Sequence, residues 1–189
     1  MQIPILPFPA NRHDTAACAH LLSARSLSLR EATTGDLPFM RDLYGQLRAD
    51  EVNQMPWPET VRQQFLDSQF SLQHHHFVTY YAKAGFYVVE HEGHDAGRLY
   101  LLREPPYFLI VDIALLPGYR RRGLGSTLLS WIKALTAQSG ADGIELHVDQ
   151  RNPDAQRLYA REGFTVTQQA VAYIGMRWVR PTSPQLNTA

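Results

Sequence analysis

Three consecutive arginines and two glycines form the pattern in this sequence with the clearest chemical use. Arg120–Arg122 precede Gly123–Gly125, between an apolar run at Phe108–Leu116 and an amphipathic run from Ser126 to about Gln138. Glycine lets the backbone turn tightly around a ligand, and arginine binds phosphate oxygens through paired N–H groups. The unpaired amides at a helix start also attract anions. A strand–loop–helix of this composition predicts a phosphate-binding loop.

A solvated basic turn before a glycine-rich helix start is the alternative interpretation. Two better-known phosphate loops fit the segment less well. A Walker loop ends in Gly-Lys-Ser/Thr, whereas Ser126 follows Gly125 directly. A dinucleotide fingerprint needs a third glycine and an early βαβ unit, and neither is present.

Ionisable side chains with catalytic potential lie on both sides of this loop. Asp112 interrupts the apolar run, His147 alternates with Asp149 in a later one, and Tyr159 follows Asn152 by seven positions. A carboxylate or an imidazole can accept a proton, and a phenol with an ordinary pKa of about 10 can donate one. Each also has a purely structural interpretation: Asp112 as the partner of an arginine, His147 as a hydrogen-bonded strand residue, and Tyr159 as a core residue.

Two further features resemble functional sites, a metal site and a cysteine nucleophile, but their positions do not fit these roles. The run His74-His75-His76 lies in a helical pattern, where consecutive side chains point about 100° apart and cannot all bind one ion. Cys18, the single cysteine, lies in a segment without clear pattern and cannot form an internal disulfide. We therefore expect no metal site and no cysteine nucleophile.

The elements that must position these residues alternate between strand and helix periods, which predicts an α/β fold with a mixed sheet and helices on both faces. A turn at Glu92–Asp95 joins two strands in a hairpin, and Val61, Phe65, Leu72 and Phe77 are the expected buried positions of the second long helix. The expected strands are Ser26–Ala32, Ala84–Glu90, Gly97–Leu102, Phe108–Leu116, Gly143–Val148, Phe164–Gln168 and Val171–Val179; the helices run through Leu37–Leu47, from Glu59 toward Tyr81, from Ser126 to about Gln138, and through Pro153–Glu162.

Two motifs in the right order resemble those of the GNAT acetyltransferase superfamily. Arg120-x-x-Gly123-x-Gly125 is similar to its Q/R-x-x-G-x-G/A signature, and Val111–Pro117 looks like its fourth strand. Leu146–Phe164 resembles the second motif, which has a strand, V-x-x-x-N, and a short helix with A-x-x-L-Y-x-x-x-G-F. The resemblance is close from Phe108 to Phe164. It implies a sheet of about seven mostly antiparallel strands, splayed between the fourth and fifth.

The resemblance also implies roles for individual residues. Tyr159 is the expected general acid, which protonates the departing thiolate. Asp112 and His147 are candidates for the base or a substrate anchor, although some family members use water chains instead. Met55 and Trp57, in a proline-rich break, are expected acceptor contacts. The residues implied in donor binding are Ile113, Ala114, Leu115, Arg120, Arg121, Arg122, Gly123, Leu124, Gly125, Ser126, Thr127, Asn152, Ala155 and Tyr159.

The implied activity is transfer of an acetyl group from acetyl-coenzyme A to an amine of a small molecule or protein, by direct attack in a ternary complex. Three alternatives stay open: a non-catalytic acyl-coenzyme A sensor or interaction module, a longer acyl donor, and a hydroxyl acceptor. A monomer or a homodimer fits the family equally well.

Composition limits the remaining possibilities. Basic and acidic side chains number 18 each, so the net charge of zero argues against a general nucleic-acid binder. No apolar run approaches the roughly 20 residues of a membrane helix, and Met1–Ala10 lacks the basic start of a signal peptide. We expect a cytoplasmic protein with a loosely ordered extension at 1–25 that includes a short helix near Ala16–Ala24, an acetyltransferase domain at 26–181, and a tail at 182–189.

Overall fold

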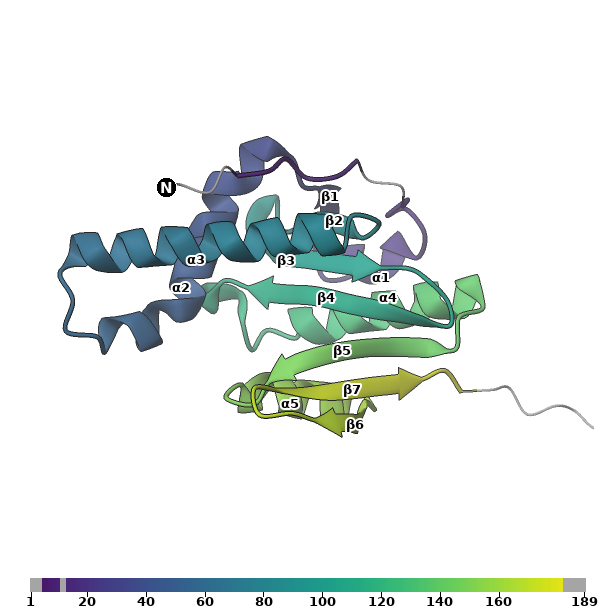
Figure 1. The fold of residues 1–189 in the computed structure, drawn as a ribbon. Helices are drawn as coiled ribbons and strands as arrows, with labels where there is room; N and C mark the ends of the chain where they lie inside the picture. Colours follow the sequence, from purple (N-terminus) through teal and green to yellow (C-terminus); the bar gives the residue numbers. More distant parts are fainter. Residues whose placement is uncertain (1–4, 11–12, 182–189) are drawn as a thin grey trace, which may run out of the picture.

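Seven strands form one mixed sheet in the computed structural model, which describes residues 5–10 and 13–181 (Figure 1). The strand order across the sheet is β1-β2-β3-β4-β5-β7-β6, and only β4 and β5 pair in parallel. The predicted tail at 182–189 lies outside the described residues. The strands are β1 (Leu27–Glu31), β2 (Gly85–His91), β3 (His94–Leu102), β4 (Tyr107–Leu115), β5 (Gly143–Asp149), β6 (Thr165–Gln169) and β7 (Tyr173–Val179).

Five α-helices and two short 3₁₀ helices make up the rest of the described secondary structure. In Figure 1, α3 lies across one face of the sheet, over β2 and β3, whereas α4 lies behind the sheet. The helices are α1 (Ala19–Ser23), α2 (Leu37–Asn53), α3 (Glu59–Tyr80), α4 (Leu124–Ser139) and α5 (Pro153–Arg161), with η1 (Thr34–Asp36) and η2 (Pro117–Tyr119).

The sheet separates two hydrophobic cores. On the α4 face, Leu128 and Ile132 of α4 pack with Leu99 of β3 and Leu146 of β5. On the opposite face, α2 and α3 cover β2 and β3, with Met40, Tyr44, Phe70, Val78, Phe86 and Tyr100 buried between them. The helices on both faces that the sequence predicts are therefore confirmed.

Local sequence explains several element ends. Asn152 caps α5 by accepting a hydrogen bond from the amide of Ala155 (3.1 Å), and Gly163 follows the helix at a φ of 83° that favours glycine. The β2–β3 turn is tighter than predicted. Glu92 and Gly93 alone form it, both with positive φ, so His91 and His94 face each other as the last pair of the ladder.

Two other expectations need correction. Helix α4 begins at Leu124, two residues before the predicted start. On α3, the buried side chains are Phe70, His74 and Val78, spaced four residues apart, whereas Val61 and Leu72 are exposed. The histidine explains the error: a polar residue occupies the centre of the buried stripe, and its Nε2 lies 2.7 Å from the carbonyl oxygen of Leu6.

The segment before β1 has more order than its sequence predicts. Residues 5–10 lie on the α3 face, where the Phe8 ring meets those of His74 and Phe86. Residues 13–25 lie on the α4 face, where Leu22 is buried and Trp131 donates from Nε1 to the Ala17 carbonyl oxygen (2.9 Å). The predicted short helix is α1, which packs against α4.

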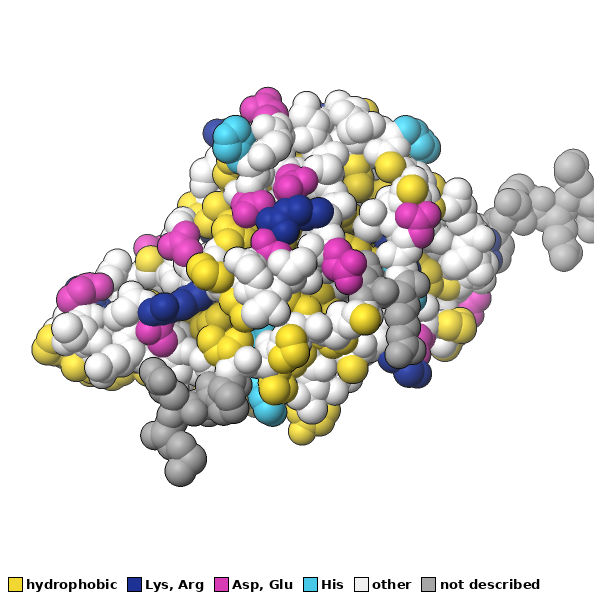
Figure 2. Space-filling view, turned by 90° about the horizontal axis from the view of Figure 1, so that it is seen from above, with side chains coloured by type: hydrophobic (Ala, Val, Ile, Leu, Met, Phe, Trp, Pro, Cys, Tyr) yellow, Lys and Arg dark blue, Asp and Glu magenta, His cyan; other side chains and the backbone are white. Residues whose placement is uncertain are grey.

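On one face of the molecule, charged side chains of both signs are mixed (Figure 2). In the view from above, basic side chains lie beside acidic ones (Figure 2). Arg30 is one example, because it pairs with Asp36, Glu90 and Asp95 at 2.7–2.9 Å. In the described part of the chain, no helix has the length and apolarity needed to cross a membrane.

Candidate active site

Strands β4 and β5 pair only at their first halves. Tyr107–Ile110 are in register with Gly143–Leu146, and beyond Ile110 β4 has no β5 partner, although β3 continues to pair with it as far as Leu115. A bulge in the β3–β4 ladder at Val111 marks the point of divergence, since Leu101 faces Ile110 and Tyr100 faces Asp112. The second half of β4 is therefore an open edge inside the sheet.

The expected donor-binding strand residues lie on this open edge. Ile113, Ala114 and Leu115 face Leu99, Arg98 and Gly97 of β3, and all three are half-buried. Gly97 is required for this spacing, because a Cβ added there would lie 2.1 Å from the Ala114 carbonyl oxygen. Unpaired backbone groups of β4 on the β5 side can hydrogen-bond an extended ligand as a further strand would.

The glycine–arginine loop follows β4 directly and leads into α4. Gly123 is the N-cap, with a φ of 79° that few other residues adopt, and no side chain caps the helix. The first amides of α4, from Leu124 through Ser126, therefore remain available to an anion, at the positive end of a 16-residue helix. Gly125 also permits close packing, since a Cβ there would lie 3.1 Å from the Leu158 side chain of α5.

The three arginines of the loop all have partners within the protein. Arg120 donates from Nε to the Leu115 carbonyl oxygen (3.0 Å), Arg121 lies 3.5 Å from Asp154, and the Arg122 guanidinium stands over the Tyr119 ring at 5.7 Å. The side chain of Arg121 is 88 % exposed, so its ion pair holds it weakly. Arg120 instead fixes the end of β4 against the loop.

A fourth arginine, which the sequence analysis did not identify, lies beside Gly123. A Cβ built on Gly123 would be 2.7 Å from Nη2 of Arg25, in the turn between α1 and β1. The structure shows no ion pair for Arg25 among the described residues. No local motif marks it, because its proximity to the loop depends on how residues 13–25 pack against α4.

Tyr159 lies on α5, on the α4 face of the sheet, and is 6 % exposed. Its ring packs against Phe164 at 5.7 Å between centroids. Burial, and then the negative charge of Asp112, raise the pKa of the phenol well above its usual value. The hydroxyl is therefore protonated throughout the neutral range and carries a proton that it can donate.

Asp112 lies where β4 leaves β5, and its side chain is 23 % exposed. It accepts a hydrogen bond at Oδ2 from Nε of Arg98 (2.6 Å), so the arginine partner considered for it in the sequence analysis is present. The negative charge of Asp112 contributes to the raised pKa of Tyr159, although the larger cause is burial of the phenol.

His147 is exposed on β5, and its ring meets that of Tyr173 edge to face at 4.9 Å. It lines a shallow hollow of about 260 Å³ over β5, β7 and β6. Asp149, at the end of the same strand, accepts hydrogen bonds from the backbone and guanidinium of Arg151, which lower its pKa. Arg151 in turn lies 3.9 Å from Glu51 of α2, so α2 reaches the end of β5.

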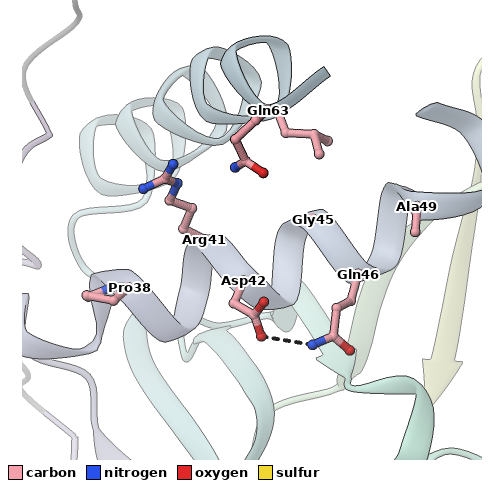
Figure 3. Close-up of a pocket in the computed structure, with 8 residues that line it drawn as sticks. Pro38, Arg41, Asp42, Gly45, Gln46, Ala49 and Gln63 are labelled. Carbon is pink, nitrogen blue, oxygen red and sulfur yellow. Dashed lines mark hydrogen bonds between the residues drawn. The ribbon is translucent and has the colours of Figure 1, made fainter. Parts of the chain in front are cut away.

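Met55 and Trp57 follow α2 in the loop before α3. Met55 is half-buried, and Trp57, 37 % exposed, packs edge to face on Phe65 at 5.3 Å. A larger hollow of about 430 Å³ lies between α2 and α3, and neither residue lines it (Figure 3). Arg41, Asp42 and Gln46 of α2 and Gln63 of α3 line this hollow, and Gln46 donates a hydrogen bond to Asp42 (2.8 Å).

Comparison with known proteins agrees with this geometry. The chain is 35% identical over 77 residues to an uncharacterized N-acetyltransferase of Mycobacterium tuberculosis, covering 40% of this chain and 49% of that protein. It is 38% identical over 55 residues to the aminoalkylphosphonate N-acetyltransferase of Salmonella typhimurium, covering 29% and 36%. The chain thus spans about half or less of the length of these relatives. With the 5-NmdU N-acetyltransferase of Pseudomonas phage PaMx11 it shares 31% identity over 99 residues, 51% of this chain and 68% of that protein.

Solved structures share the fold at low sequence identity. The PaiA N-acetyltransferase of Thermoplasma acidophilum, in complex with coenzyme A, matches with a TM-score of 0.63 and 16% identity over 82% of this chain and 99% of that one. The spermidine N-acetyltransferase of Vibrio cholerae, in complex with coenzyme A and spermine, matches with a TM-score of 0.57 and 21% identity over 82% and 96%.

The family assignment follows from the extent of the sequence match together with the splayed sheet. Residues 46–164 match the model of the Acetyltransferase (GNAT) family, which is more than half of the chain and includes the open edge of β4, the glycine–arginine loop and α5. The chain belongs to the acetyltransferase (GNAT) family.

Proposed function

We propose that the protein transfers an acetyl group from acetyl-coenzyme A to an amine. The observation that carries this proposal is the loss of β4–β5 pairing over the second half of β4, which leads into a loop that ends in the uncapped start of α4. One ligand with an amide-containing arm and a pyrophosphate matches both features. Acetyl-coenzyme A is such a ligand, and coenzyme A is present in two of the structures with this fold.

On the donor side, each group of residues has a separate role. The backbone of Ile113–Leu115 hydrogen-bonds the pantetheine arm, and the amides from Leu124 to Ser126 bind the pyrophosphate. Arg25, Arg121 and Arg122 add positive charge at the rim of the loop. Asn152 and Ala155 line the side formed by α5, where Asn152 also holds the helix start in place.

On the chemical side, Tyr159 donates its proton to the sulfur that leaves when the new C–N bond has formed and the C–S bond breaks. A backbone amide of β4 stabilises the oxyanion that forms on the thioester carbon. The amine must first lose a proton, because an alkyl ammonium has a pKa of about 10.4. Asp112, at the point where β4 leaves β5, is the first candidate to accept it, His147 is the second, and a chain of water molecules is the third.

The acceptor is an amine of a small molecule or a protein. Similar proteins bear names that include aminoalkylphosphonate and spermidine, which makes these two amine types the first to test. Met55 and Trp57, in the loop between α2 and α3, are the proposed acceptor contacts. We assign the protein to the cytoplasm, as a monomer or homodimer, and keep the domain boundary at residue 26 as part of the proposal.

The test combines binding with turnover. Calorimetry with acetyl-coenzyme A measures donor affinity, and release of free thiol is then followed against 2-aminoethylphosphonate, spermidine and a peptide with N-terminal alanine. We expect micromolar binding and thiol release that depends on one of these amines. Binding without release on any amine would instead favour a sensor of acyl-coenzyme A, and an absence of binding would refute the donor site.

A further inference from the structure

Arg98 is a charged side chain on β3 that is only 2 % exposed and packs against α3. It follows Gly97, which lets β3 lie close to β4. Burial alone would lower the pKa of its guanidinium, but Asp112 and Tyr100 outweigh this effect and raise it. Replacing a buried ion pair with apolar residues is often neutral or favourable for stability. Packing alone therefore does not explain why a charged side chain is buried where β4 and β5 diverge.

The guanidinium connects three elements at this point. Its Nε donates to Asp112 Oδ2 on β4 at 2.6 Å, and its Nη2 donates to Gln73 Oε1 on α3 at 2.8 Å. The rings of Phe77 and Tyr100 lie 5.8 and 5.3 Å from Cζ, which leaves the side chain little freedom. Arg98 thus fixes both the Asp112 carboxylate and the distance of α3 from the open edge of β4.

The way in which Arg98 holds Asp112 leaves one carboxylate oxygen available. Only Oδ2 takes part in the hydrogen bond, and the structure shows no partner for Oδ1 among the described residues. Asp112 is also the charged residue that acts on the Tyr159 phenol. A carboxylate oriented in this way, at the point where β4 separates from β5, can accept a hydrogen bond from an amine through Oδ1.

We propose that Arg98 is a positioning residue for the acceptor. It orients Asp112 so that Oδ1 receives a hydrogen bond from the acceptor amine, and through Gln73 it fixes the distance between α3 and the open edge of β4. This inference rests on the proposed acetyltransferase function. It assigns Arg98 no contact with the donor. Its removal therefore affects acceptor binding and reaction but not donor binding.

The test uses Arg98→Lys, which keeps the charge but loses the fork that bonds Asp112 and Gln73 together. With the best amine of the panel, we expect kcat/KM for the amine to fall by about 100-fold, as for a misplaced reacting group, while the Kd for acetyl-coenzyme A stays within about twofold. Gln73→Ala keeps the Arg98–Asp112 bond and should show a smaller loss. Arg62→Lys, at a half-buried arginine that pairs with Glu59 of the same helix, is the matched control.

A double-mutant cycle separates positioning from general structural support. If Arg98 acts through Asp112, Arg98→Lys has little further effect on kcat/KM in the Asp112→Asn background. Additive losses, a loss of donor affinity, or an unchanged kcat/KM in Arg98→Lys would each overturn the inference, and so would wild-type protein that binds acetyl-coenzyme A but acetylates none of the amines. Failure of the wild-type protein to bind acetyl-coenzyme A would instead overturn the proposed function itself. Thermal unfolding of each variant confirms that it is folded.

Discussion

Tyr159 illustrates how the same residue can satisfy a structural and a chemical interpretation. Its ring is part of the core on the α4 face, as the structural interpretation predicts, and its burial next to Asp112 keeps the phenol protonated. A proton donor for a thiolate needs that protonation state. The sequence could therefore not decide between the two interpretations, because the fold uses one side chain for both.

Tyr159→Phe is expected to lower kcat by about 100-fold, since a general acid contributes about that factor or more. The ring still fills its site against Phe164, so the Kd for acetyl-coenzyme A and the midpoint of thermal unfolding should change little. Steady-state kinetics and calorimetry on the same preparation measure these quantities. An unchanged kcat would remove Tyr159 from the mechanism.

Arg25 can be separated from the other arginines by the choice of donor. Arg25→Ala should weaken acetyl-coenzyme A binding by about 10- to 100-fold, because a charged hydrogen bond to phosphate is lost. S-acetylpantetheine lacks the pyrophosphate, so kcat/KM for this truncated donor should not change. Arg62→Ala, which removes an arginine distant from the loop, should affect neither donor. Equal losses with both donors would show that Arg25 supports the fold rather than the phosphates.

At the scale of the elements, the sequence predicts where each helix and strand lies along the chain better than it predicts which of their side chains are buried. All seven strands and the four long helices occur where their periodicity indicates, with ends that differ by a few residues. The predicted buried face of α3 was wrong at Val61 and Leu72. The buried stripe runs through His74, a polar residue that an apolar pattern does not include. The burial of Arg98 could not be predicted for the same reason. In the run Gly97–Leu102 an arginine is typical of a solvent-facing strand position, and only the packing of α3 buries it.

The contact between β3 and β4 gives a direct test of the open edge. Gly97→Ala places a Cβ against the Ala114 carbonyl oxygen, so the strands must separate or the backbone must shift. We expect a loss of about 1–3 kcal/mol in the free energy of unfolding, together with weaker donor binding, since Ala114 lies in the proposed donor strand. Urea denaturation and calorimetry measure the two effects.

Gly45→Ala is the control for this substitution. Gly45 lies inside α2, and a Cβ there would be 3.9 Å from the nearest Leu66 side-chain atom, an ordinary contact. Alanine favours a helix interior over glycine by up to about 1 kcal/mol, so this variant should be more stable than the wild type. Similar destabilisation in both variants would contradict the explanation given for Gly97.

At the scale of the whole molecule, the segment before β1 joins the two cores. Leu6 and Phe8 lie on the α3 face, and Leu22 lies on the α4 face. Arg103 donates from Nη1 to the Asp14 carbonyl oxygen (2.9 Å) where the chain passes between them. No sequence pattern predicts this arrangement, because the contacts are made by single residues at irregular spacing.

His74, which is buried under this segment, is expected to make the stability of the fold depend on pH. Burial, more than any other effect, lowers the pKa of His74, and its bond to Leu6 opposes that shift. Below a pH of about 6.5 the unfolded chain therefore binds a proton that the folded protein excludes, so stability is full above that pH and declines as the pH falls below it. His74→Gln should reduce this acid-side loss, measured by urea denaturation at pH 5 and pH 8.

The exposed neighbour provides the control for this prediction. His75→Gln should leave the difference in stability between pH 5 and pH 8 as it is in the wild type, because His75 is exposed on α3. If the two variants show the same pH dependence, the buried histidine is not its source.

The bond between Ala17 and Trp131 also has a consequence for how the protein is made. The two residues are 114 positions apart, so residues 13–25 leave the ribosome long before α4 exists to receive them. Until α4 is present, Leu22 cannot be buried, and residues 13–25 are accessible to chaperones and proteases. Nascent chains that end before α4 should thus be cut readily within residues 13–25, and chains that extend past β7 should resist.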